Sequence, residues 1–323
     1  MIVFITGASG FIGSRLVEHL LDRGDSQIYA LVRNPAKLSW LPDNPALHLL
    51  GGDLLTLPDL PKNLEVVFHL AGLTKAANRS AYYTVNQQGT ARLVEHLLQH
   101  GLSPKFIYLS SLAAGRPAMD GQPVKEDEPP EPASPYGESK LLAEQEILKH
   151  RQILPATIIR AAAIYGPRDR DFLQFFELIN RGWMFTFSQV ITMSLCYVDD
   201  LVRALELCAE KSPGQGEIYN VADPVPRTWE EIGEEAARIL NKKVKKVKVS
   251  LRLARAAAAL SELGSKLSGK PSPLNLSKYR DMEKLSWVAD PAKIKEELGF
   301  ETAWPFSQAL EVTINWYKAN GWL

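Results

Sequence analysis

Short apolar stretches alternate with amphipathic stretches through the first half of the chain. The apolar stretches predict strands over residues 2–6, 27–32, 47–50, 66–70, 106–109 and 157–165. The amphipathic stretches predict helices over residues 13–23, 85–99 and 135–150. Strands that are apolar on both faces and alternate with helices are typical of a parallel sheet with helices on both sides. The pattern therefore predicts an α/β fold with a Rossmann-type, doubly wound parallel sheet.

The alternation becomes looser after residue 166. A helix is predicted around residues 172–179, and a strand over 183–187, where aromatic residues occupy every second position. A helix over 198–211 and a strand over 218–221 then return to the large sheet. A smaller, mainly helical substrate lobe is expected over the carboxyl edge of the sheet, where ligands bind in such folds. The predicted units are a Rossmann domain of residues 1–166, to which 198–222 return, and a substrate lobe of residues 167–197 and 223–323.

The composition narrows the kinds of partner and the cellular compartment. Lysine plus arginine equals aspartate plus glutamate, at 37 each, so no nucleic-acid partner is expected. Two cysteines are too few for a disulfide framework, and the first residues form a predicted strand rather than a signal peptide. No apolar stretch is long enough to span a membrane. A cytoplasmic location without stable membrane insertion is therefore expected.

One segment is strongly basic. Residues 241–270 contain nine basic residues and one acidic residue, Glu262, which gives a local charge of +8. Within it, residues 251–267 have leucines at helical spacing, and we interpret them as a helix that covers the substrate pocket. A helix that rests on a membrane surface is the alternative. Its alanine content disfavours that alternative, because alanine inserts weakly into lipid.

A glycine-rich turn separates the first strand from the first helix. It reads Gly7-Ala-Ser-Gly10-Phe-Ile-Gly13. A phosphate needs backbone N–H groups close to it and the positive end of a helix dipole behind them. Gly7 permits the turn, Gly10 lets the backbone approach a pyrophosphate, and Gly13 lets the helix pack on the strand. The residues predicted to bind the pyrophosphate are Gly7, Ser9, Gly10, Phe11, Ile12 and Gly13.

The end of the second strand indicates which dinucleotide binds. NAD sites place an acidic residue there, whereas the 2′-phosphate of NADP requires cations. Here Arg33 follows the strand, Lys37 is close by, and no acidic residue occurs before Asp43. Arg33 can form a bidentate pair with a phosphate and stack on adenine. We therefore predict NADP as the cofactor and regard NAD as less favoured; an exposed basic turn without a ligand is the alternative.

A second motif carries the chemistry. Tyr136 and Lys140 are four residues apart in a predicted helix, so their side chains lie on one face. A free tyrosine holds its proton tightly at neutral pH, and a lysine one helical turn away favours the phenolate. Ser111, just beyond the strand of residues 106–109, can donate a hydrogen bond to a substrate oxygen. We therefore predict that Tyr136, Lys140 and Ser111 are catalytic.

These motifs resemble those of the extended short-chain dehydrogenase/reductase family, also called the NAD-dependent epimerase/dehydratase family. Matching segments are residues 6–13, 52–54, 68–72, 86–90, 110–111, 136–140, 164–167, 197–200, 297–300 and 320–323. The resemblance implies that Asn86 supports the proton-relay site and that Lys140 also binds the nicotinamide ribose. It implies a homodimer formed through the helices of residues 85–99 and 135–150. It further implies cofactor contacts for Asp53, Leu54, Leu70, Ala71, Gly72, Ala161, Ala163 and Ile164.

Several departures from the family's patterns narrow the reaction. Ala161 replaces a proline that the family usually has beside the nicotinamide. Residues 112–114 are Leu-Ala-Ala, where sugar dehydratases carry an acidic pair. Met193 replaces an arginine with which nucleotide-sugar epimerases hold a diphosphate. Dehydration and epimerisation are therefore disfavoured.

An apolar substrate is expected instead. The residues predicted to form an apolar pocket, with the core of the lobe as the alternative, are Phe172, Phe176, Trp183, Met184 and Phe185. Residues 32–35 and 287–291 resemble the branch of dihydroflavonol reductases and 3β-hydroxysteroid dehydrogenases. The sequence therefore predicts an NADP(H)-dependent oxidoreductase that reduces the carbonyl, or oxidises the alcohol, of a small, fairly apolar molecule. A nucleotide-sugar epimerase is the first alternative, and a non-catalytic NADP(H)-binding sensor the second.

No metal site is expected. His96 and His100 are four residues apart on one predicted helix, a spacing that can bind a metal. The sequence near them offers no third ligand, so we interpret them as part of a solvated helix face.

Overall fold

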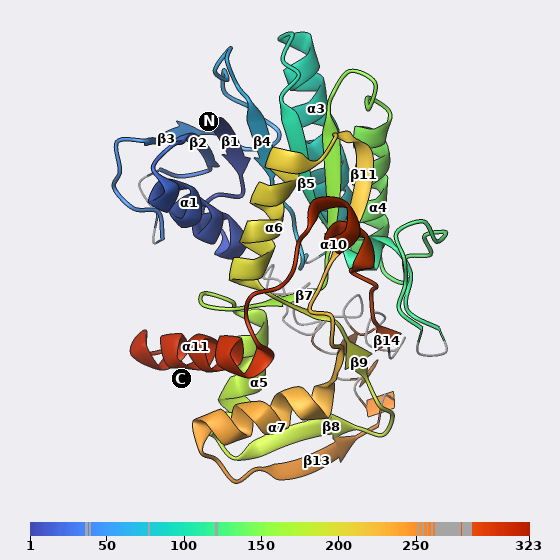
Figure 1. The fold of residues 1–323 in the computed structure, drawn as a ribbon. Coiled ribbons are helices and arrows are strands. Elements are labelled where there is room, and N and C mark those ends of the chain that lie inside the picture. Colours follow the sequence, from blue (N-terminus) through green and yellow to red (C-terminus); the bar gives the residue numbers. More distant parts are fainter. Residues whose placement is uncertain are drawn as a thin grey trace.

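Seven parallel strands form the central sheet of the protein (Figure 1). The computed structural model describes residues 1–35, 38, 40–76, 78–119, 122–250 and 286–323, together with some positions between 252 and 279. Neighbouring strands follow the order β11-β6-β5-β4-β1-β2-β3, and each pair is parallel. The strands are β1 (Ile2–Thr6), β2 (Gln27–Val32), β3 (Leu47–Gly51), β4 (Val66–His69), β5 (Lys105–Ser111), β6 (Ala156–Ala161) and β11 (Gln215–Val221).

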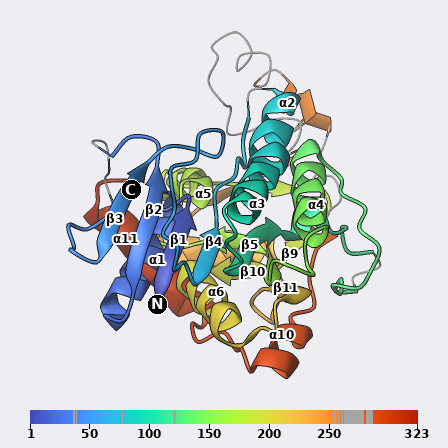
Figure 2. The ribbon, with the colours of Figure 1, turned by 90° about the horizontal axis from the view of Figure 1, so that it is seen from above.

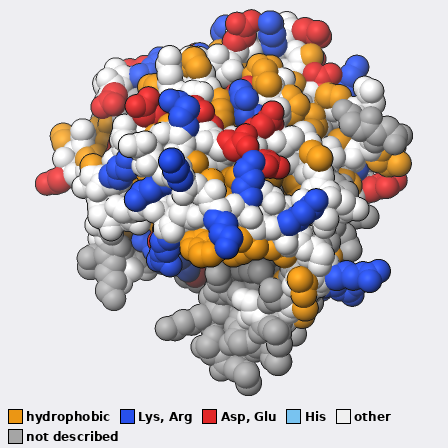
Figure 3. Space-filling view, turned by 90° about the horizontal axis from the view of Figure 1, so that it is seen from below, with side chains coloured by type: hydrophobic (Ala, Val, Ile, Leu, Met, Phe, Trp, Pro, Cys, Tyr) orange, Lys and Arg blue, Asp and Glu red, His pale blue; other side chains and the backbone are white. Residues whose placement is uncertain are grey.

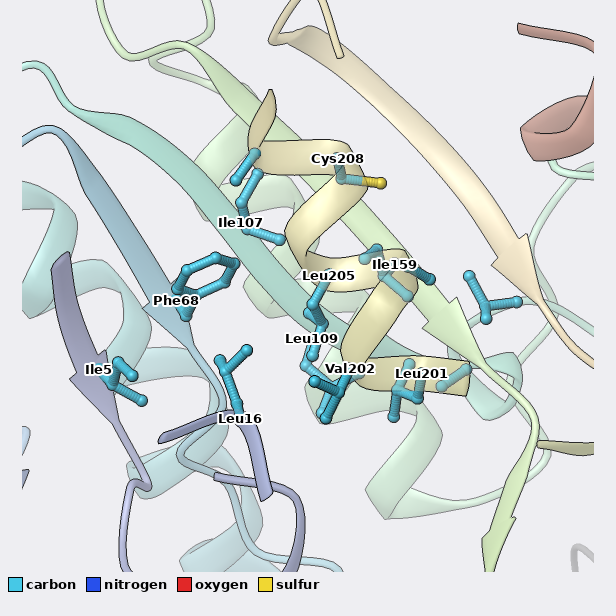
Figure 4. Packing of buried hydrophobic residues seen from close by; sticks show 14 of the residues in the cluster. Ile5, Leu16, Phe68, Ile107, Leu109, Ile159, Leu201, Val202, Leu205 and Cys208 are labelled. Atoms are coloured by element: carbon cyan, nitrogen blue, oxygen red, sulfur yellow. The ribbon is translucent and has the colours of Figure 1, made fainter. Parts of the chain in front are cut away.

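Helices cover both faces of this sheet, which confirms the predicted Rossmann-type fold (Figure 2). Alternate strand residues enter the two layers: Phe68 and Ile107 pack beneath α6 (Figure 4), whereas Val67 and Phe106 pack on the opposite face. Both layers are apolar, which explains the continuous apolar stretches of the strands. Among the helices of the described residues, none combines the length and apolar character needed to cross a membrane. One face carries α1 (Phe11–Arg23), α6 (Val198–Lys211) and α10 (Ala292–Leu298), and the other carries α3 (Gly89–Gln99) and α4 (Pro135–Leu148).

The predicted strand over residues 157–165 is two strands. β6 ends at Ala161, and β7 (Ala163–Tyr165) leaves the large sheet to pair with β10 (Leu195–Tyr197). The chain therefore turns out of the sheet at Ala162 and enters the substrate lobe. The sequence pattern does not reveal this break, because β6 and β7 are both apolar and form one continuous apolar stretch.

The predicted helix over residues 85–99 starts earlier and is not uniform. A short helix, α2 (Arg79–Tyr82), continues into a π-helical segment, η1 (Tyr83–Gln88), before α3 begins. Segments of π-helix are rare and frequently mark functional sites. Here the segment contains the buried Asn86.

The smaller lobe lies at the carboxyl edge of the sheet, in the lower part of Figure 1. Its core includes Phe176, Met184, Ile232 and Ile314. Positions 251, 254, 257, 260 and 262–267 lie outside the described residues, and with them most of the helix predicted over 251–267. The elements of the lobe are α5 (Asp171–Asn180), α7 (Trp229–Leu240), α11 (Phe306–Ala319), the pair β8 (Trp183–Phe187) and β13 (Lys245–Val249), and the strands β9 (Thr192–Met193), β12 (Arg227–Thr228) and β14 (Ser286–Trp287).

Helix α10 belongs by sequence to the segment assigned to the lobe, but it packs on the large sheet. Ile294 and Leu298 join the core beneath α6. The Tyr219 hydroxyl of β11 donates a hydrogen bond to Glu297 of α10 at 2.8 Å. The domain boundaries stay a prediction, and α10 is a return from the C-terminal segment to the Rossmann domain.

Candidate active site

Close backbone contacts shape the turn between β1 and α1. Gly7 has a φ of +75°, and a Cβ there would lie 2.8 Å from the nitrogen of Ala71 and 2.9 Å from the carbonyl carbon of Leu70. A Cβ on Gly13 would lie 2.2 Å from the carbonyl oxygen of Gly7. The Gly10 N–H donates to that same oxygen at 3.0 Å. Positions 7 and 13 therefore require glycine, and the turn lies directly against the end of β4.

The N-terminus of α1 is open toward this turn. Gly10 is the N-cap and makes no side-chain capping bond, and the first turn of the helix holds no acidic residue. Ser9 and Gly10 are exposed, whereas the side chains of Phe11 and Ile12 pack against the core of the lobe. Backbone N–H groups and the positive end of the helix dipole therefore face the turn. A pyrophosphate group fits this arrangement.

The residues predicted to contact the adenosine lie at the ends of β2 and β3. Arg33 follows β2 and is exposed, while Lys37 lies outside the described residues. The Asp53 Oδ1 atom accepts backbone N–H bonds of 2.8 and 2.9 Å from the turn after β3. Leu54 is buried against Gly89. A Cβ on Gly89 would lie 2.9 Å from the Cδ1 atom of Leu54. Asp53 therefore fixes the turn and Leu54 supports α3, and their predicted contacts with adenine stay predictions.

Three predicted residues meet in the loop after β4. A Cβ on Gly72 would lie 3.2 Å from the Asn86 Oδ1 and 3.7 Å from the Lys140 Nζ. Asn86 accepts a hydrogen bond from the Leu73 N–H at 2.7 Å and donates one to the Leu73 carbonyl at 3.1 Å. Asn86 also donates to the Ser139 hydroxyl at 2.9 Å. Asn86 therefore ties this loop to the helix that carries Lys140.

A buried histidine without a predicted role lies behind these residues. The His69 ring nitrogens lie 2.6 Å from the Thr6 hydroxyl and 2.8 Å from the Thr90 hydroxyl. The Thr90 hydroxyl donates to the Asn86 carbonyl at 2.6 Å, so it accepts from the Nε2–H of His69. Burial, together with the charge of Lys140, lowers the pKa of His69 to about 3. His69 is therefore neutral, and it links β1, β4 and the start of α3.

Helix α4 presents Tyr136 in its first turn. A Cβ on Gly137 would lie 2.1 Å from the carbonyl oxygen of Ala113. Glycine therefore lets the helix touch the 3₁₀ turn η2 (Leu112–Ala114). Ser111 directly precedes this turn, and its hydroxyl accepts the Ala113 N–H at 3.2 Å. The same close contact thus brings the start of α4, with Tyr136, to the end of β5, with Ser111.

The Lys140 side chain is buried at this end of β5, with 5% exposed. Its Nζ donates to the Leu109 carbonyl at 2.6 Å and lies 4.2 Å from the centre of the Tyr108 ring. Burial lowers the pKa of Lys140 to about 7, and Glu144, one turn along the helix, acts in the opposite direction. A lysine whose pKa is close to neutrality can exchange a proton with a neighbouring group at physiological pH.

Glu144 is committed to other partners. Its carboxylate forms a two-bond ion pair with Arg160 of β6, at 3.1 and 2.8 Å, and both side chains are buried. The Ser110 hydroxyl donates to the same carboxylate. This pair fixes α4 to the neighbouring strand. Arg160 stands out in the sequence as a charged residue in the apolar strand β6, but α4 holds several charged residues, so the pairing with Glu144 follows only from the fold.

The residues predicted to face the nicotinamide lie where the chain passes from the sheet to the lobe. Ala161 ends β6 and is the register partner of Ser111 on β5. Ala163 and Ile164 are half-buried in β7 and pack against the core of the lobe. The three residues therefore border the same edge of the sheet as Ser111 and the start of α4.

The five residues predicted to form an apolar pocket do not gather at one site, and the alternative, the core of the lobe, holds for Phe172, Phe176 and Met184. Phe176 and Met184 are fully buried in the core of the lobe, and Phe172 stacks on Phe176 with 6.0 Å between ring centres. Trp183 and Phe185 point the other way and are 44% and 38% exposed. Strand β8 therefore alternates between the core and solvent.

Met193 lies in β9 opposite Arg227 of β12. The guanidinium carbon of Arg227 lies 4.3 Å from the centre of the Phe306 ring in α11. Arg227, the basic residue that is paired with Met193, therefore stacks on the Phe306 ring of α11. Residues 192–197 themselves contain no basic side chain.

The family model described as the NAD dependent epimerase/dehydratase family matches residues 3–222. The chain belongs to this family. Its members are the extended short-chain dehydrogenases/reductases, which are NAD-dependent oxidoreductases, epimerases and dehydratases. The protein is therefore an enzyme of the oxidoreductase or epimerase type, and Tyr136 and Lys140 carry the family's motif.

Similarity to individual family members extends over the whole chain. The chain is 31% identical over 327 residues to the ceramide reductase of Caulobacter vibrioides (strain NA1000 / CB15N), covering 100% of this chain and 96% of that protein. It is 26% identical over 337 residues to the 3-beta-hydroxysteroid dehydrogenase of Mycolicibacterium neoaurum, covering 98% and 91%. The solved structure of MoeE5 in complex with UDP-glucuronic acid and NAD has a TM-score of 0.79 and 26% identity, covering 99% and 100%. The lobe therefore belongs to the shared architecture as much as the sheet does.

The buried Lys140 predicts a pH dependence of stability. In the unfolded chain a lysine has a pKa of about 10.4, whereas in the folded protein the pKa of Lys140 is about 7. Between these values the unfolded state binds one more proton, so the free energy of unfolding rises with pH, by up to about 1.4 kcal/mol per unit. We expect urea unfolding between about pH 7 and pH 9 to show this rise in the wild type and a smaller one in Lys140→Met.

Lys149→Met is the matched control for this comparison. Lys149 lies on the exposed side at the end of the same helix. Its removal should leave the pH slope of the wild type unchanged. Equal slopes in the wild type and in Lys140→Met would contradict the assignment of a near-neutral pKa to Lys140.

Proposed function

We propose that the protein is an NADP(H)-dependent oxidoreductase that reduces the carbonyl of a fairly apolar molecule, or oxidises the corresponding alcohol. The observation that carries this proposal is the buried Lys140 Nζ, which donates to the Leu109 carbonyl and lies beside Gly72, where a Cβ would approach it to 3.7 Å. The same helix presents Tyr136 beside the strand end of Ser111. A proton donor and a hydrogen-bond donor thus lie at the edge of the sheet where the predicted cofactor residues end.

Each residue has a distinct role in this proposal. A bound nicotinamide dinucleotide supplies or accepts the hydride. Tyr136 gives its phenolic proton to the substrate oxygen, and Lys140 favours the resulting phenolate through its charge. Ser111 holds the same oxygen by a hydrogen bond. Asn86 keeps the Gly72 loop and α4 in fixed positions, through its bonds to Leu73 and Ser139.

An apolar substrate is supported by two observations. The names of two full-length relatives, a ceramide reductase and a 3-beta-hydroxysteroid dehydrogenase, denote oxidoreductases of lipid substrates. Met193 also leaves the strand before Tyr197 without a cation, whereas a diphosphate needs cationic partners.

A nucleotide-sugar epimerase is the second candidate. The likeness to MoeE5, whose structure holds UDP-glucuronic acid and NAD, covers the entire fold. Arg227 lies opposite Met193, and its Nε atom has no partner among the described residues, so it could turn toward a diphosphate. Titration with UDP-glucuronic acid distinguishes the candidates: tight binding that Arg227→Gln abolishes would favour the epimerase.

Replacement of Tyr136 by phenylalanine tests the proposed chemistry. The change removes one hydroxyl and keeps the ring, so NADPH affinity should stay nearly unchanged while turnover falls by about a hundredfold or more. Lys140→Met should reduce both turnover and cofactor binding, because its ammonium serves both. Turnover is measured as loss of NADPH absorbance on a panel of apolar ketones and aldehydes, including 3-ketosteroids and long-chain ketones.

Tyr83→Phe is the matched control for the loss of a tyrosine hydroxyl. Tyr83 lies on η1, where its hydroxyl donates to Glu138 at 2.6 Å and receives a bond from Arg79. We expect this variant to keep wild-type turnover. Full activity of Tyr136→Phe on a substrate of the wild type would refute the proposed proton transfer.

Arg33 should make the enzyme prefer NADP(H) to NAD(H). A charge-assisted pair with the 2′-phosphate corresponds to a preference of roughly ten- to a hundredfold. In Arg33→Gln this preference should largely disappear, whereas Arg181→Gln, at the exposed end of α5, should retain it. Fluorescence titrations with both cofactors measure the ratio. Equal affinities in the wild type, or tighter binding of NAD(H), would contradict the role of Arg33.

The proposed enzyme is a homodimer that pairs α3 and α4 with their copies. The two helices lie side by side on one face of the sheet (Figure 2). Leu141 and Leu142 of α4 are half-buried and belong to none of the hydrophobic clusters of the described residues. A partner helix would cover them. Leu141 and Leu142 replaced together by arginine should give a monomer in light scattering, whereas Ile153→Arg, in an exposed turn, should not. A monomeric wild type would refute this arrangement.

A further inference from the structure

The pair of strands β8 and β13 has one side on which Trp183 and Phe185 are exposed, while Phe187 at its end contacts Trp229 of α7. Met184 and Thr186 of β8 are buried on the inner side, whereas Trp183 and Phe185 are exposed on the outer side. Register partners in a parallel pair lie on the same side, so β13 adds its own residues to this side. We call this surface the outer face, and its residues are Trp183, Phe185, Phe187, Lys245, Val247 and Val249.

The rim of the outer face is positively charged. Residues 241–250 contain five lysines and no acidic residue. The Lys245 Nζ lies 5.4 Å from the centre of the Trp183 ring, whereas Lys246 and Lys248 are the register partners of Met184 and Thr186 and belong to the opposite side. Arg252 and Leu253 follow, both exposed, with Leu253 at 66%. Figure 3 shows this end of the molecule, where apolar side chains gather between lysine and arginine side chains.

One lysine of the strand is neutralised on the opposite side. The Lys246 Nζ pairs with Glu230 and Glu234 of α7 at 2.5 and 2.6 Å. These carboxylates therefore do not compensate the lysines around the outer face. Among the described residues, the outer face is thus an apolar surface whose rim carries the positive charges of Lys245 and Arg252.

This combination matches the surface of an anionic bilayer. Tryptophan and phenylalanine favour the boundary between headgroups and acyl chains. A lysine near an anionic leaflet contributes about 1 kcal/mol of attraction. We propose that the outer face binds the surface of an anionic phospholipid membrane and holds the enzyme there as a peripheral protein.

Two other occupants fit the outer face less well. A second copy of the chain bound through the same face by twofold symmetry would bring lysines against lysines. A nucleic acid would match the charge and could stack on Trp183 and Phe185, but Val247, Val249 and Leu253 offer no stacking partner for bases and favour acyl chains instead. The proposal does not depend on the reaction, since lipid binding can be measured without a substrate.

Co-sedimentation with vesicles tests the proposal. The wild type should bind vesicles of phosphatidylcholine mixed with phosphatidylglycerol, and should bind pure phosphatidylcholine at least about tenfold more weakly. Added salt should weaken the binding. Trp183→Ser combined with Phe185→Ser should lower the affinity about tenfold or more, and Lys245→Glu combined with Arg252→Glu by a comparable factor.

Matched controls change exposed residues elsewhere. Ile153→Ser removes an exposed apolar side chain, and Lys62→Glu reverses an exposed charge in the loop before β4. Both should bind vesicles as the wild type does, and all variants should retain the wild-type melting temperature and NADPH affinity. The proposal is overturned if the wild type ignores anionic vesicles or if the outer-face variants bind like the controls. It is also overturned if the Trp183 and Phe185 variant only changes the oligomeric state in light scattering, or if the same face binds single-stranded nucleic acid more tightly than lipid.

Discussion

The burial of the Lys140 side chain at the end of β5 determines how the other residues of the active site are arranged. Removing an ammonium from water is costly, and within the described part of the chain the Leu109 carbonyl and the face of Tyr108 replace the hydration of Lys140. Glu144 does not neutralise it, because its carboxylate is bonded to Arg160 and Ser110. Burial brings the pKa of Lys140 down to about 7, so the site holds a basic group that gains and loses its proton near neutral pH, as the proposed proton transfer requires.

This arrangement depends on how closely α4 approaches the neighbouring strands. Gly137 leaves no side chain between the helix and the Ala113 carbonyl, and the Glu144–Arg160 pair fixes the next turn of the helix to β6. Asn86 fixes the other side, and the π-helical segment places its amide on the loop after β4. A larger residue at 137 would push Tyr136 away from Ser111, because the obstacle is backbone and cannot move aside.

The sequence predicts those features of the site that depend on a single turn or on one face of a single helix. The glycine spacing and the Tyr136–Lys140 spacing each follow from one turn or one helix face, and the structure places both at the edge of the sheet. The links from Thr6 through His69 to Thr90 join elements that are far apart in sequence, so no local pattern reveals them. The break at Ala162 was invisible for a different reason, since β6 and β7 are equally apolar although they belong to different sheets.

The alternating pattern of aromatic and other residues in β8 does not predict which face of the strand is buried. Every second residue is aromatic, which predicts a strand with two unlike faces but does not say which face meets the core. The structure buries the smaller residues, Met184 and Thr186, and leaves Trp183 and Phe185 outside. Burial of large aromatic side chains is strongly favourable, so a strand oriented this way forgoes that stabilisation unless something else covers the aromatics. Lys245 beside Trp183 adds a positive charge to the same surface, so the proposed cover is anionic as well as apolar, a combination that a lipid bilayer provides and the core of the lobe does not.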